Sequence, residues 1–483
     1  MSEPATQAVH TDAAPAPLAL PHDGPRDAPR DAVHDAAQGL RGVRSVRLAG
    51  LRGELSNPLF RNAYALMANG GLTGVLGLGY WLLAARLYPP DVVGRNSAVL
   101  QAVMFVSGLT AINYMLIRFI PQSGRRTRRL VVASYAVGAL SGALIALGFL
   151  LTLGAWGPSF ARLAHPGPAL WFIVGVLAWN IFAQQDGVFT GLRRAGWVPV
   201  ENAVFGVAKI ALLIPFAMLS PADGVLLSTV VPAVIALFPV NWLIFRRLIP
   251  AHVAATDGRH RPPTIGQIGR YMSGDYVGSL FSHASINLIP VVVAAHISPA
   301  DNAYFMMAWV LGAMLDLLAT NMAMSLTVEG AFDGARLAES CRAALRRTVM
   351  LVVPAALVII VAAPIGLRIF GDSYVHGTGL LRLLAAAALP KAIIEIYMGV
   401  LRVQSRTRPV AVLQAVRCIG VLAVILVYTA GDRYLVTVGG AVLAVHVVVA
   451  AAIYPRLRAI ARPIGAPHDP QASFASGPES DIR

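Results

Sequence analysis

The sequence predicts an all-α integral membrane protein with about twelve transmembrane helices in two related halves of six. Twelve long apolar stretches fill residues 60–455, and the second six repeat the pattern of the first six at an offset of about 210 residues. The chain of 483 residues is 56% hydrophobic and 13% charged, whereas soluble domains carry about 25% charged residues. In a bilayer, a duplicated six-helix unit is typical of a transporter whose halves move about a central site.

Each apolar stretch is long enough to cross a bilayer, which takes about 20 residues for about 30 Å of hydrocarbon. The stretch at 130–157 contains no charged residue, and a few others contain one to three. The stretch at 272–296 is the weakest of the twelve. In order, the predicted spans are 64–85, 97–117, 130–157, 169–188, 200–219, 224–245, 272–296, 302–328, 348–367, 379–400, 410–429 and 434–455.

Basic residues are distributed asymmetrically among the loops. If the N-terminus is cytoplasmic, 30 of the 39 lysines and arginines lie in cytoplasmic segments, five in outer loops and four within spans. Such an excess marks the cytoplasmic side of membrane proteins. The pattern predicts a multi-pass protein of a bacterial-type plasma membrane with both termini cytoplasmic. The charges are spread over seven segments, which argues against the single basic patch of a nucleic-acid-binding protein.

Polar segments divide the chain into domains. Residues 1–56 and 459–483 lack an apolar period and are predicted to be disordered cytoplasmic tails. Residues 249–270 are predicted to form a cytoplasmic linker between six-helix bundles at 57–248 and 271–458. No apolar core follows the first positive charges, so we expect the first span to act as the membrane signal rather than a cleaved signal peptide.

Two pairs of motifs mark the internal repeat. Pro89-Pro90-Asp91 follows the first stretch and Pro299-Ala300-Asp301 follows the seventh. Residues 191–199 (GLRRAGWVP) and 401–409 (LRVQSRTRP) are short basic turns that each close with a proline. Because proline is tolerated in the first turn of a helix, both pairs are predicted to precede or begin equivalent helices in the two halves.

Five cations within or at the ends of spans are candidates for a substrate-binding lumen. A charge near the bilayer centre costs roughly 2.5 to more than 10 kcal/mol, so it usually faces a cavity or a partner. Lys209 and Lys391 lie near the middle of their spans, and Arg417 has in the second half nearly the place of Lys209 in the first. Arg382 and Arg118 lie nearer span ends, where anchoring to headgroups is the alternative, as partial snorkelling is for Arg417.

Four acids in the predicted spans are assigned to coupling or buried pairing. Asp316 is expected to be the buried partner of a cation or part of a proton or sodium relay. Glu395 lies one turn from Lys391, so an intrahelical pair is an alternative to a lumen-facing pair. Asp275 and Asp186 lie nearer the cytoplasmic face, where solvation alone is enough to explain them.

The sequence predicts no catalytic residue, metal site or cofactor. Cys341 lies in a polar loop and Cys418 in an apolar span, so both are expected to be inert thiols. If the five cations line one cavity, that cavity is electropositive, and arginine and lysine suit phosphate. An anion with a large polar part and a lipid tail fits such a cavity. A lipid-linked sugar pyrophosphate has this chemistry, as do other amphipathic anions.

Several short motifs carry a resemblance to a known family. Residues 85–94 (ARLYPPDVVG) with 113–121 (NYMLIRFIP), and in the second half 370–374 (FGDSY) with 380–384 (LLRLL), resemble polysaccharide exporters and O-antigen-type flippases. These proteins belong to the multidrug/oligosaccharidyl-lipid/polysaccharide superfamily. The resemblance covers roughly residues 58–458.

The resemblance implies two six-helix bundles in a MATE-like V shape with alternating access. It also implies that an undecaprenyl-pyrophosphate-linked oligosaccharide is flipped from the cytoplasmic to the outer leaflet for cell-surface polysaccharide or lipopolysaccharide biosynthesis. Lys209, Lys391 and Arg417 would supply the cationic central lumen. Cytoplasmic glycosyltransferases and a polysaccharide polymerase are candidate partners. The lipid II flippase branch usually has cations in its first span, where this chain has only Arg61 at the start, which argues against a peptidoglycan-precursor role.

Two other functions compete with lipid flipping. A multidrug/cation antiporter of the same superfamily would tend to place an acid in its first span, but residues 62–90 contain neither Asp nor Glu. A membrane glycosyltransferase, polymerase or ligase needs acids or a large outer loop to form a site. The outer loops at 220–223 and 296–301 are short, and the first outer loop offers only Asp91. The sequence therefore favours a transporter over an enzyme.

Overall fold

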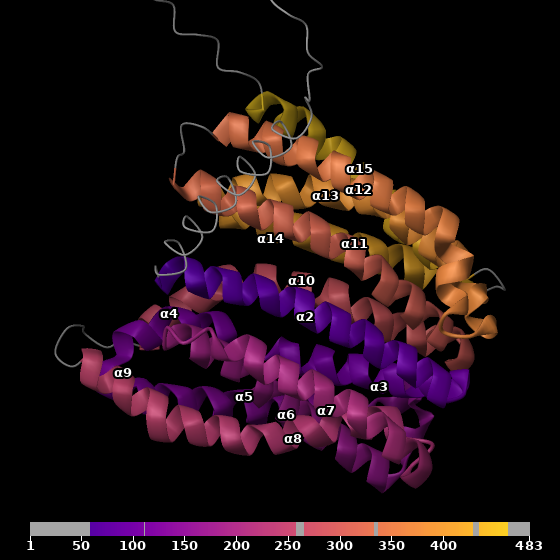
Figure 1. The fold of residues 1–483 in the computed structure, drawn as a ribbon, viewed down its shortest axis with the longest axis horizontal. Helices are drawn as coiled ribbons and strands as arrows, with labels where there is room; N and C mark the ends of the chain where they lie inside the picture. The colour runs from indigo at the N-terminus through magenta and orange to yellow at the C-terminus, as the bar shows by residue number, and fades with distance from the viewer. Residues whose placement is uncertain (1–57, 111, 257–264, 333–336, 428–433, 462–483) are drawn as a thin grey trace, which may run out of the picture. The chain divides into compact units, whose positions relative to one another are not determined.

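The computed structural model describes residues 58–110, 112–256, 265–332, 337–427 and 434–461. Residues Asn62–Arg483 group into one compact unit. The described residues are almost entirely helical (Figure 1), which confirms the predicted fold class. The predicted tails lie largely outside the described residues, as does part of the predicted linker.

The described residues of the first half form seven long or medium helices. They are α2 (Pro58–Leu87), α3 (Pro90–Leu109), α4 (Asn113–Ser123), α5 (Thr127–Leu151), α6 (Pro166–Gly191), α7 (Trp197–Leu219) and α8 (Gly224–Leu243). Short helical turns lie between or after them: η1 (Gly124–Arg126), η2 (Leu153–Ala155), η3 (Pro158–Ala164), the π-helical turn η4 (Ile244–Leu248) and α9 (Ile249–Thr256).

In the second half, the described residues form six long helices and one short turn. They are α10 (Ile265–His296), α11 (Pro299–Phe332), α12 (Leu337–Arg368), the turn η6 (Asp372–Gly377), α13 (Thr378–Val403), α14 (Thr407–Val427) and α15 (Tyr434–Ile460). In Figure 1 the indigo and magenta helices of the first half lie together, and the orange and yellow helices α11 to α15 lie together beside them.

Eleven helical segments of the described residues are long and apolar enough to cross a membrane. The helix α2 is not among them, although its 30 residues would extend about 45 Å. Each predicted span overlaps one of the long helices. The predicted span at 97–117 is wrong in its bounds, because α3 begins earlier, at Pro90, and ends at Leu109, and a new helix begins at Asn113.

The early start of α3 also corrects the predicted outer loop. Pro89 is its N-cap and Pro90 its first residue, and proline suits this place because the N–H it lacks has no partner there. Arg86 therefore lies in the last turn of α2, and Arg95 lies in α3, where it forms an ion pair with Asp91 at 2.7 Å.

The two basic turns adopt the same backbone geometry. Arg193, between α6 and α7, has φ of 58°, and Ser405, between α13 and α14, has φ of 57°. In each turn the next N–H, of Arg194 or Arg406, donates to a carbonyl five residues earlier, at 2.8 and 2.9 Å. This 6→1 bond with a left-handed residue is the Schellman ending of a helix. The internal repeat read from the sequence is thus present in the backbone.

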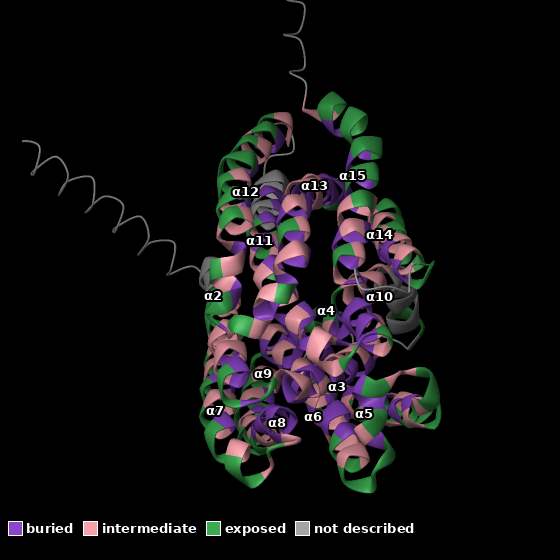
Figure 2. Cartoon of the chain, turned by 90° about the vertical axis from the view of Figure 1, so that its right-hand side faces the viewer, coloured by how far each residue is buried: buried purple, intermediate pink, exposed green. Residues whose placement is uncertain are grey.

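Helix α5 shows how these helices pack. Gly138, Gly142 and Ala146 recur every four residues and are buried, whereas Leu140 and Leu144 are 65% and 61% exposed. A Cβ on Gly142 would lie 3.3 Å from Val176 of α6. Small residues let membrane helices approach closely, while large apolar side chains are stable facing lipid. Figure 2 shows exposed residues on the outward sides of α5, α7 and α12.

The halves contact each other along α3, where His283 of α10 stacks on Phe105, and at the end of the helices where η3 and η6 lie, which we term the η3 end. Here α3 packs on α11. A Cβ on Gly94 would overlap the carbonyl of Pro299. Asn302 Nδ2 donates to Gly94 O at 2.8 Å and to Ser97 Oγ at 3.2 Å. A glycine is required at position 94 because the backbone of α11 occupies the space of a side chain.

Two more contacts join the halves at the η3 end. Arg86 of α2 donates from Nε to Ile369 O at 2.9 Å and from Nη2 to Arg368 O at 3.3 Å. These carbonyls follow the last turn of α12, where helix carbonyls lack intrahelical partners. Gly157 has φ of 73° and lies against the Ala295 carbonyl of α10. The opposite end, with the α6–α7 and α13–α14 turns and α9, is termed the α9 end.

Candidate functional site

A pocket of about 280 Å³ lies among α10, α11, α13, α14 and α15. Its polar lining includes Asp316, Thr320, Lys391, Arg417 and His446. The rest of the lining is mostly apolar and includes Ile289, Trp309, Leu384, Val421 and Val442. The pocket thus combines apolar walls with charged groups, all contributed by the second half of the chain.

The first ion pair in this pocket joins α13 to α11. Lys391 Nζ donates to Asp316 Oδ2 at 2.8 Å and also lies 6.0 Å from the ring centroid of Trp309. The lysine side chain is 11% exposed and the aspartate 38%, because the carboxyl group borders the pocket. Asp316 Oδ1 is buried and has no hydrogen-bond partner among the described residues, so the ion pair leaves one acceptor of this carboxylate unused.

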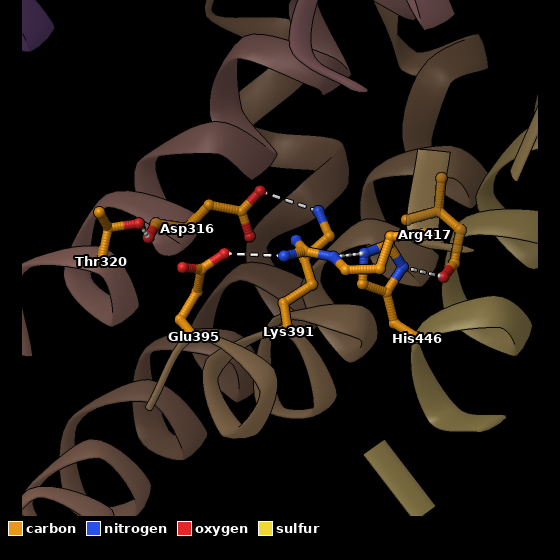
Figure 3. Close-up of polar contacts among 7 residues, drawn as sticks. Asp316, Thr320, Lys391, Glu395, Arg417 and His446 are labelled. Atoms are coloured by element: carbon orange, nitrogen blue, oxygen red, sulfur yellow. Dashed lines mark hydrogen bonds and ion pairs between the residues drawn. The ribbon is translucent and has the colours of Figure 1, made fainter. Parts of the chain in front are cut away.

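The second ion pair joins α14 to α13. Arg417 Nη1 donates to Glu395 Oε1 at 2.9 Å, and Arg417 Nε lies 3.2 Å from His446 Nε2. His446 Nδ1 lies 2.6 Å from Val442 O, so Nδ1 carries the proton and Nε2 accepts from Arg417. Figure 3 shows the three groups in a row beside the Lys391–Asp316 pair.

The alternative of an intrahelical Lys391–Glu395 pair is not what the structure contains. The two residues lie one turn apart on α13, but each reaches a different neighbouring helix. The two ion pairs between helices neutralise all four charges in the apolar interior and also hold α11, α13 and α14 together. An i,i+4 pair of Lys391 with Glu395 would instead leave Asp316 and Arg417 without these counter-ions.

The charges of the cluster balance. Two cations, Lys391 and Arg417, pair with two acids, Asp316 and Glu395. The sequence had predicted an electropositive cavity, whereas these four charges sum to zero. In this structure both cations at the pocket are neutralised by an acid. An anionic ligand would bind by competing with a carboxylate for Lys391 or Arg417, because both cations already donate to an acid.

Lys209 lies apart from this pocket. It is on α7 of the first half, with Nζ 4.5 Å from the ring centroid of Tyr80 on α2 and 5.5 Å from that of Phe205. Among the described residues it has no acidic partner. Cation–π contact with two rings, rather than an ion pair, therefore stabilises this partly buried ammonium group. Its role in substrate binding stays a prediction.

Two of the predicted lumen cations are exposed and do not line the pocket. Arg382, on α13, donates from Nε to Ile360 O of α12 at 3.1 Å. Arg118, on the amphipathic helix α4, is exposed on the side opposite the buried Leu116 and Ile120. Their positions fit the headgroup-anchor alternative, and a substrate contact stays a prediction for both.

The two remaining acids lie elsewhere in the chain. Asp186, on α6, accepts a long 3.4 Å hydrogen bond from Asn202 Nδ2 of α7. Asp275 belongs to α10, but its side chain lies outside the described residues. The pocket therefore brings together Lys391, Arg417 and Asp316 from the predicted set, with Glu395 behind Arg417.

Two polar residues of the membrane interior were not among the predicted site residues. His446 gave no signal beyond its place in an apolar stretch, and only the fold brings it to Arg417. Glu201 lies within the predicted span 200–219 and is 7% exposed. The sequence did carry a signal for Glu201, because it is an acid in an apolar stretch, one turn before Phe205. The structure places both residues on the buried side of α7.

Solved structures of membrane transporters share this arrangement of helices. An inward-facing conformation of a multidrug resistance MATE family transporter of the MOP superfamily is 15% identical, covers 80% of this chain and 95% of its own, and has a TM-score of 0.61. The chain has the MATE fold. An outward-facing conformation of such a transporter is 17% identical and covers 86% of this chain and 98% of its own, with a TM-score of 0.55.

A third solved structure with the MATE fold comes from Pyrococcus furiosus. It is a MOP superfamily transporter described as having a binding pocket of reverse polarity that suggests a different function. It is 15% identical, covers 86% of this chain and 98% of its own, and has a TM-score of 0.54. No protein-family model matches the sequence, and no curated protein matches it.

Proposed function

We propose that this chain is a membrane transporter that moves a lipid-linked oligosaccharide, carried on undecaprenyl pyrophosphate, from the cytoplasmic to the outer leaflet. The MATE fold supports transport as the activity. The observation that carries the choice of substrate is the pocket itself, where Lys391 and Arg417 lie among apolar walls. Lysine and arginine bind phosphate by charge and by forked donors, and apolar walls accept part of a lipid chain.

The proposal includes an orientation in the membrane. Exposed arginines gather at the α9 end, on η1, on the α6–α7 turn and on η4: Arg125, Arg126, Arg193, Arg194, Arg246 and Arg247. Cytoplasmic faces of membrane proteins carry such an excess, so the α9 end faces the cytoplasm of a bacterial-type cell and both termini lie inside. The contacts at the η3 end then close the protein toward the outside, and transport requires that they separate.

A flipping assay with purified protein tests the proposed substrate. Proteoliposomes carry a fluorescent polyprenyl-pyrophosphate sugar, and a membrane-impermeant quencher reports the fraction in the outer leaflet. We expect the wild-type chain to move the labelled lipid and Arg417→Ala to move little of it. An exposed arginine outside the pocket, Arg402→Ala, is the matched control. If the wild-type protein leaves the lipid in its original leaflet, the substrate is a different one.

A multidrug/cation antiporter is the second candidate, and one observation favours it. Asp316 and Trp309 both line the pocket, and Asp316 Oδ1 has no hydrogen-bond partner among the described residues. A carboxylate and an indole ring are the groups that would hold an organic cation. Uptake of a cationic dye into proteoliposomes under an imposed proton or sodium gradient distinguishes the two. Dye movement that requires Asp316, without lipid flipping, would favour the antiporter.

A further inference from the structure

Two carboxyl groups in the first half lie outside the pocket and lack a cationic partner among the described residues. They are Asp186 of α6 and Glu201 of α7. Glu201 is 7% exposed, and both of its carboxyl oxygens are buried without a hydrogen-bond partner. A buried, unpaired carboxylate is strongly unfavourable in an apolar interior. The surroundings of Glu201 must therefore supply a proton or a cation that makes its burial tolerable.

The packing of α6 on α7 brings the two acids together. The rings of Phe182 and Phe205 meet with centroids 4.9 Å apart. One turn toward the α9 end, α6 presents Asp186 and α7 presents Glu201, because residues four apart lie on one face of a helix. Asn202 Nδ2 lies 3.4 Å from Asp186 Oδ1 and confirms this register. Asp186 and Glu201 are close enough for their charges to repel each other.

Two further polar groups without partners lie on the adjoining surfaces. Gln185 is fully buried at 0% exposure, and neither atom of its amide has a hydrogen-bond partner among the described residues. It follows Phe182 by three residues, which places it on the same side of α6. Tyr135 of α5 is an electrostatic neighbour of Glu201, and its hydroxyl is likewise buried without a partner. Buried polar groups without partners among the described residues thus occur on α5, α6 and α7, three helices of the first half.

The nearby backbone is unusual as well. The Tyr135 ring packs edge-on against Phe245 at 6.3 Å, and Phe245 belongs to the π-helical turn η4. Single π-helical turns within α-helices frequently occur at functional sites, because they shift side chains out of the regular register. Through the contact of Phe245 with Tyr135, this turn adjoins the polar region.

We propose that Asp186 and Glu201 form a proton-binding site at the α9 end of the first half, in which one proton is shared between the two carboxyl groups. Two neighbouring carboxylates in a medium of low dielectric cannot both be ionised, so one of them holds a proton. The proton resides on Glu201, whose two carboxyl oxygens are both buried without a partner among the described residues, and its release to water at the α9 end leaves two repelling carboxylates. Binding and release of the proton at this site would favour different packing arrangements of α6 on α7.

The other titratable groups on the packed elements leave the pair without a counter-ion. Helix α8 contributes none. The groups on the other packed elements toward the α9 end are Tyr114 and Arg118 of α4, Arg128, Arg129 and Tyr135 of α5, Lys209 two turns along α7 against Tyr80, His252 of α9, and the exposed arginines of the α6–α7 turn and of η4. None of these arginines or lysines forms an ion pair with Asp186 or Glu201 among the described residues.

Infrared spectroscopy of the full chain in lipid nanodiscs tests the site without any transport substrate, so its outcome is separate from that of the flipping assay. A protonated buried carboxyl group has its own carbonyl-stretch band. We expect this band at neutral pH in the wild-type protein and in Glu339→Gln, which removes an exposed glutamate at the start of α12. In Glu201→Gln we expect the band of one carboxyl group to be lost.

A measurement on the unmutated protein keeps the test independent of folding defects in the variant. Incorporation of ¹³C-labelled glutamate should shift the same band, since the proton resides on Glu201. An unshifted band, or a band that persists unchanged in Glu201→Gln, would overturn the proposal. Loss of the band when sodium is added at constant pH would also overturn it, because the site would then hold a metal cation rather than a proton.

Discussion

Lys391 Nζ lies 2.8 Å from Asp316 Oδ2, an ion pair that joins helices α13 and α11 across 75 residues of sequence. One turn along α13, Glu395 accepts from Arg417 of α14 at 2.9 Å. Each cation that faces the pocket is therefore already occupied by a carboxylate. In the proposed function, binding of a phosphate would require release of a carboxylate, so the acids Asp316 and Glu395 would set how tightly an anion is held.

The linkage predicts the effect of removing the acid nearest the pocket. In Asp316→Asn, Lys391 loses its counter-ion and holds a bound phosphate more tightly. We expect slower transport, because release of the substrate becomes harder, together with tighter binding. Flipping rates in proteoliposomes measured over a range of pH check this. Rates that equal those of the wild type at every pH would argue against a role for Asp316 in coupling or release.

The same pair predicts a measurable coupling in stability. Removing one partner of a buried pair typically costs about 3–5 kcal/mol, but the Asp316 side chain is 38% exposed, so we expect about 1–3 kcal/mol for Lys391→Ala. The double variant Lys391→Ala/Asp316→Ala should recover part of that loss, because no unpaired charge remains. Thermal unfolding of the four proteins in one detergent gives the coupling. Strict additivity would mean that the pair contributes nothing.

Arg417 makes two contacts that a lysine cannot both reproduce. Hydrogen bonds to charged groups contribute about 1.5–3 kcal/mol, so Arg417→Ala should reduce flipping roughly tenfold or more. Arg417→Lys keeps the charge but loses the fork that reaches both Glu395 and His446, and it should transport at an intermediate rate. By contrast, Arg382→Ala should leave flipping near the wild-type rate, because that side chain is exposed and bonds only the Ile360 carbonyl among its described contacts.

The close packing of α3 on α11 at the η3 end predicts that a substitution there changes the conformation of the protein. A Cβ at Gly94 would overlap the Pro299 carbonyl, so Gly94→Ala should push α3 away from α11. Overpacking of this kind typically costs about 1–3 kcal/mol, which would favour the state in which the η3 end is open. Gly440→Ala is the matched control, because a Cβ there meets nothing within 4 Å.

Spin labels at the η3 end measure this change. Ala161→Cys in η3 and Asp372→Cys in η6 place one label on each half at exposed positions. The native Cys341 and Cys418 are buried and should remain unlabelled. Pulsed electron resonance should detect a longer distance in Gly94→Ala and not in the glycine control. The same distance distribution in both variants would show that the contact does not hold the halves together.

Arg162 and Asp223 form a two-pronged ion pair at the η3 end, with Nε–Oδ1 at 3.0 Å and Nη2–Oδ2 at 2.8 Å. The hydrogen bonds from Arg162 to Asp223 raise the pKa of Arg162 above its ordinary value. The stabilisation by a raised basic pKa is complete below the unfolded-state pKa and is lost only as pH rises through the raised value, so alkaline pH up to about 10 should leave it intact.

The size of that stabilisation should be small. The arginine side chain is 41% exposed, and pairs of this kind contribute at most about 1 kcal/mol. Asp223→Asn should therefore lower the unfolding temperature slightly, with a difference from the wild type that shrinks as salt is added. A large and salt-independent loss would indicate that Asp223 also holds η3 in place by another contact.

The sequence by itself determined the membrane class, the number of apolar stretches and the internal repeat. These features are local: a span is a continuous run of apolar residues, and the turns at Arg193 and Ser405 each depend on a few neighbouring residues. It also indicated which charged residues are energetically unfavourable in the membrane, because a lysine or aspartate within an apolar stretch can be recognised from the sequence alone. Lys391, Asp316 and Arg417 were found in this way.

Only the tertiary structure decided how those charges are arranged. It showed that Lys209 lies apart from Lys391 and packs against Tyr80. It also showed that Glu395 pairs with Arg417 rather than with Lys391, and that His446 lies beside Arg417. The burial of Glu201 without a hydrogen-bond partner among the described residues likewise depends on the packing of the helices. The physical reason is that an ion pair forms between helices whose contact depends on the packing of the whole unit, and a helical period fixes the face of a residue but not the helix opposite it.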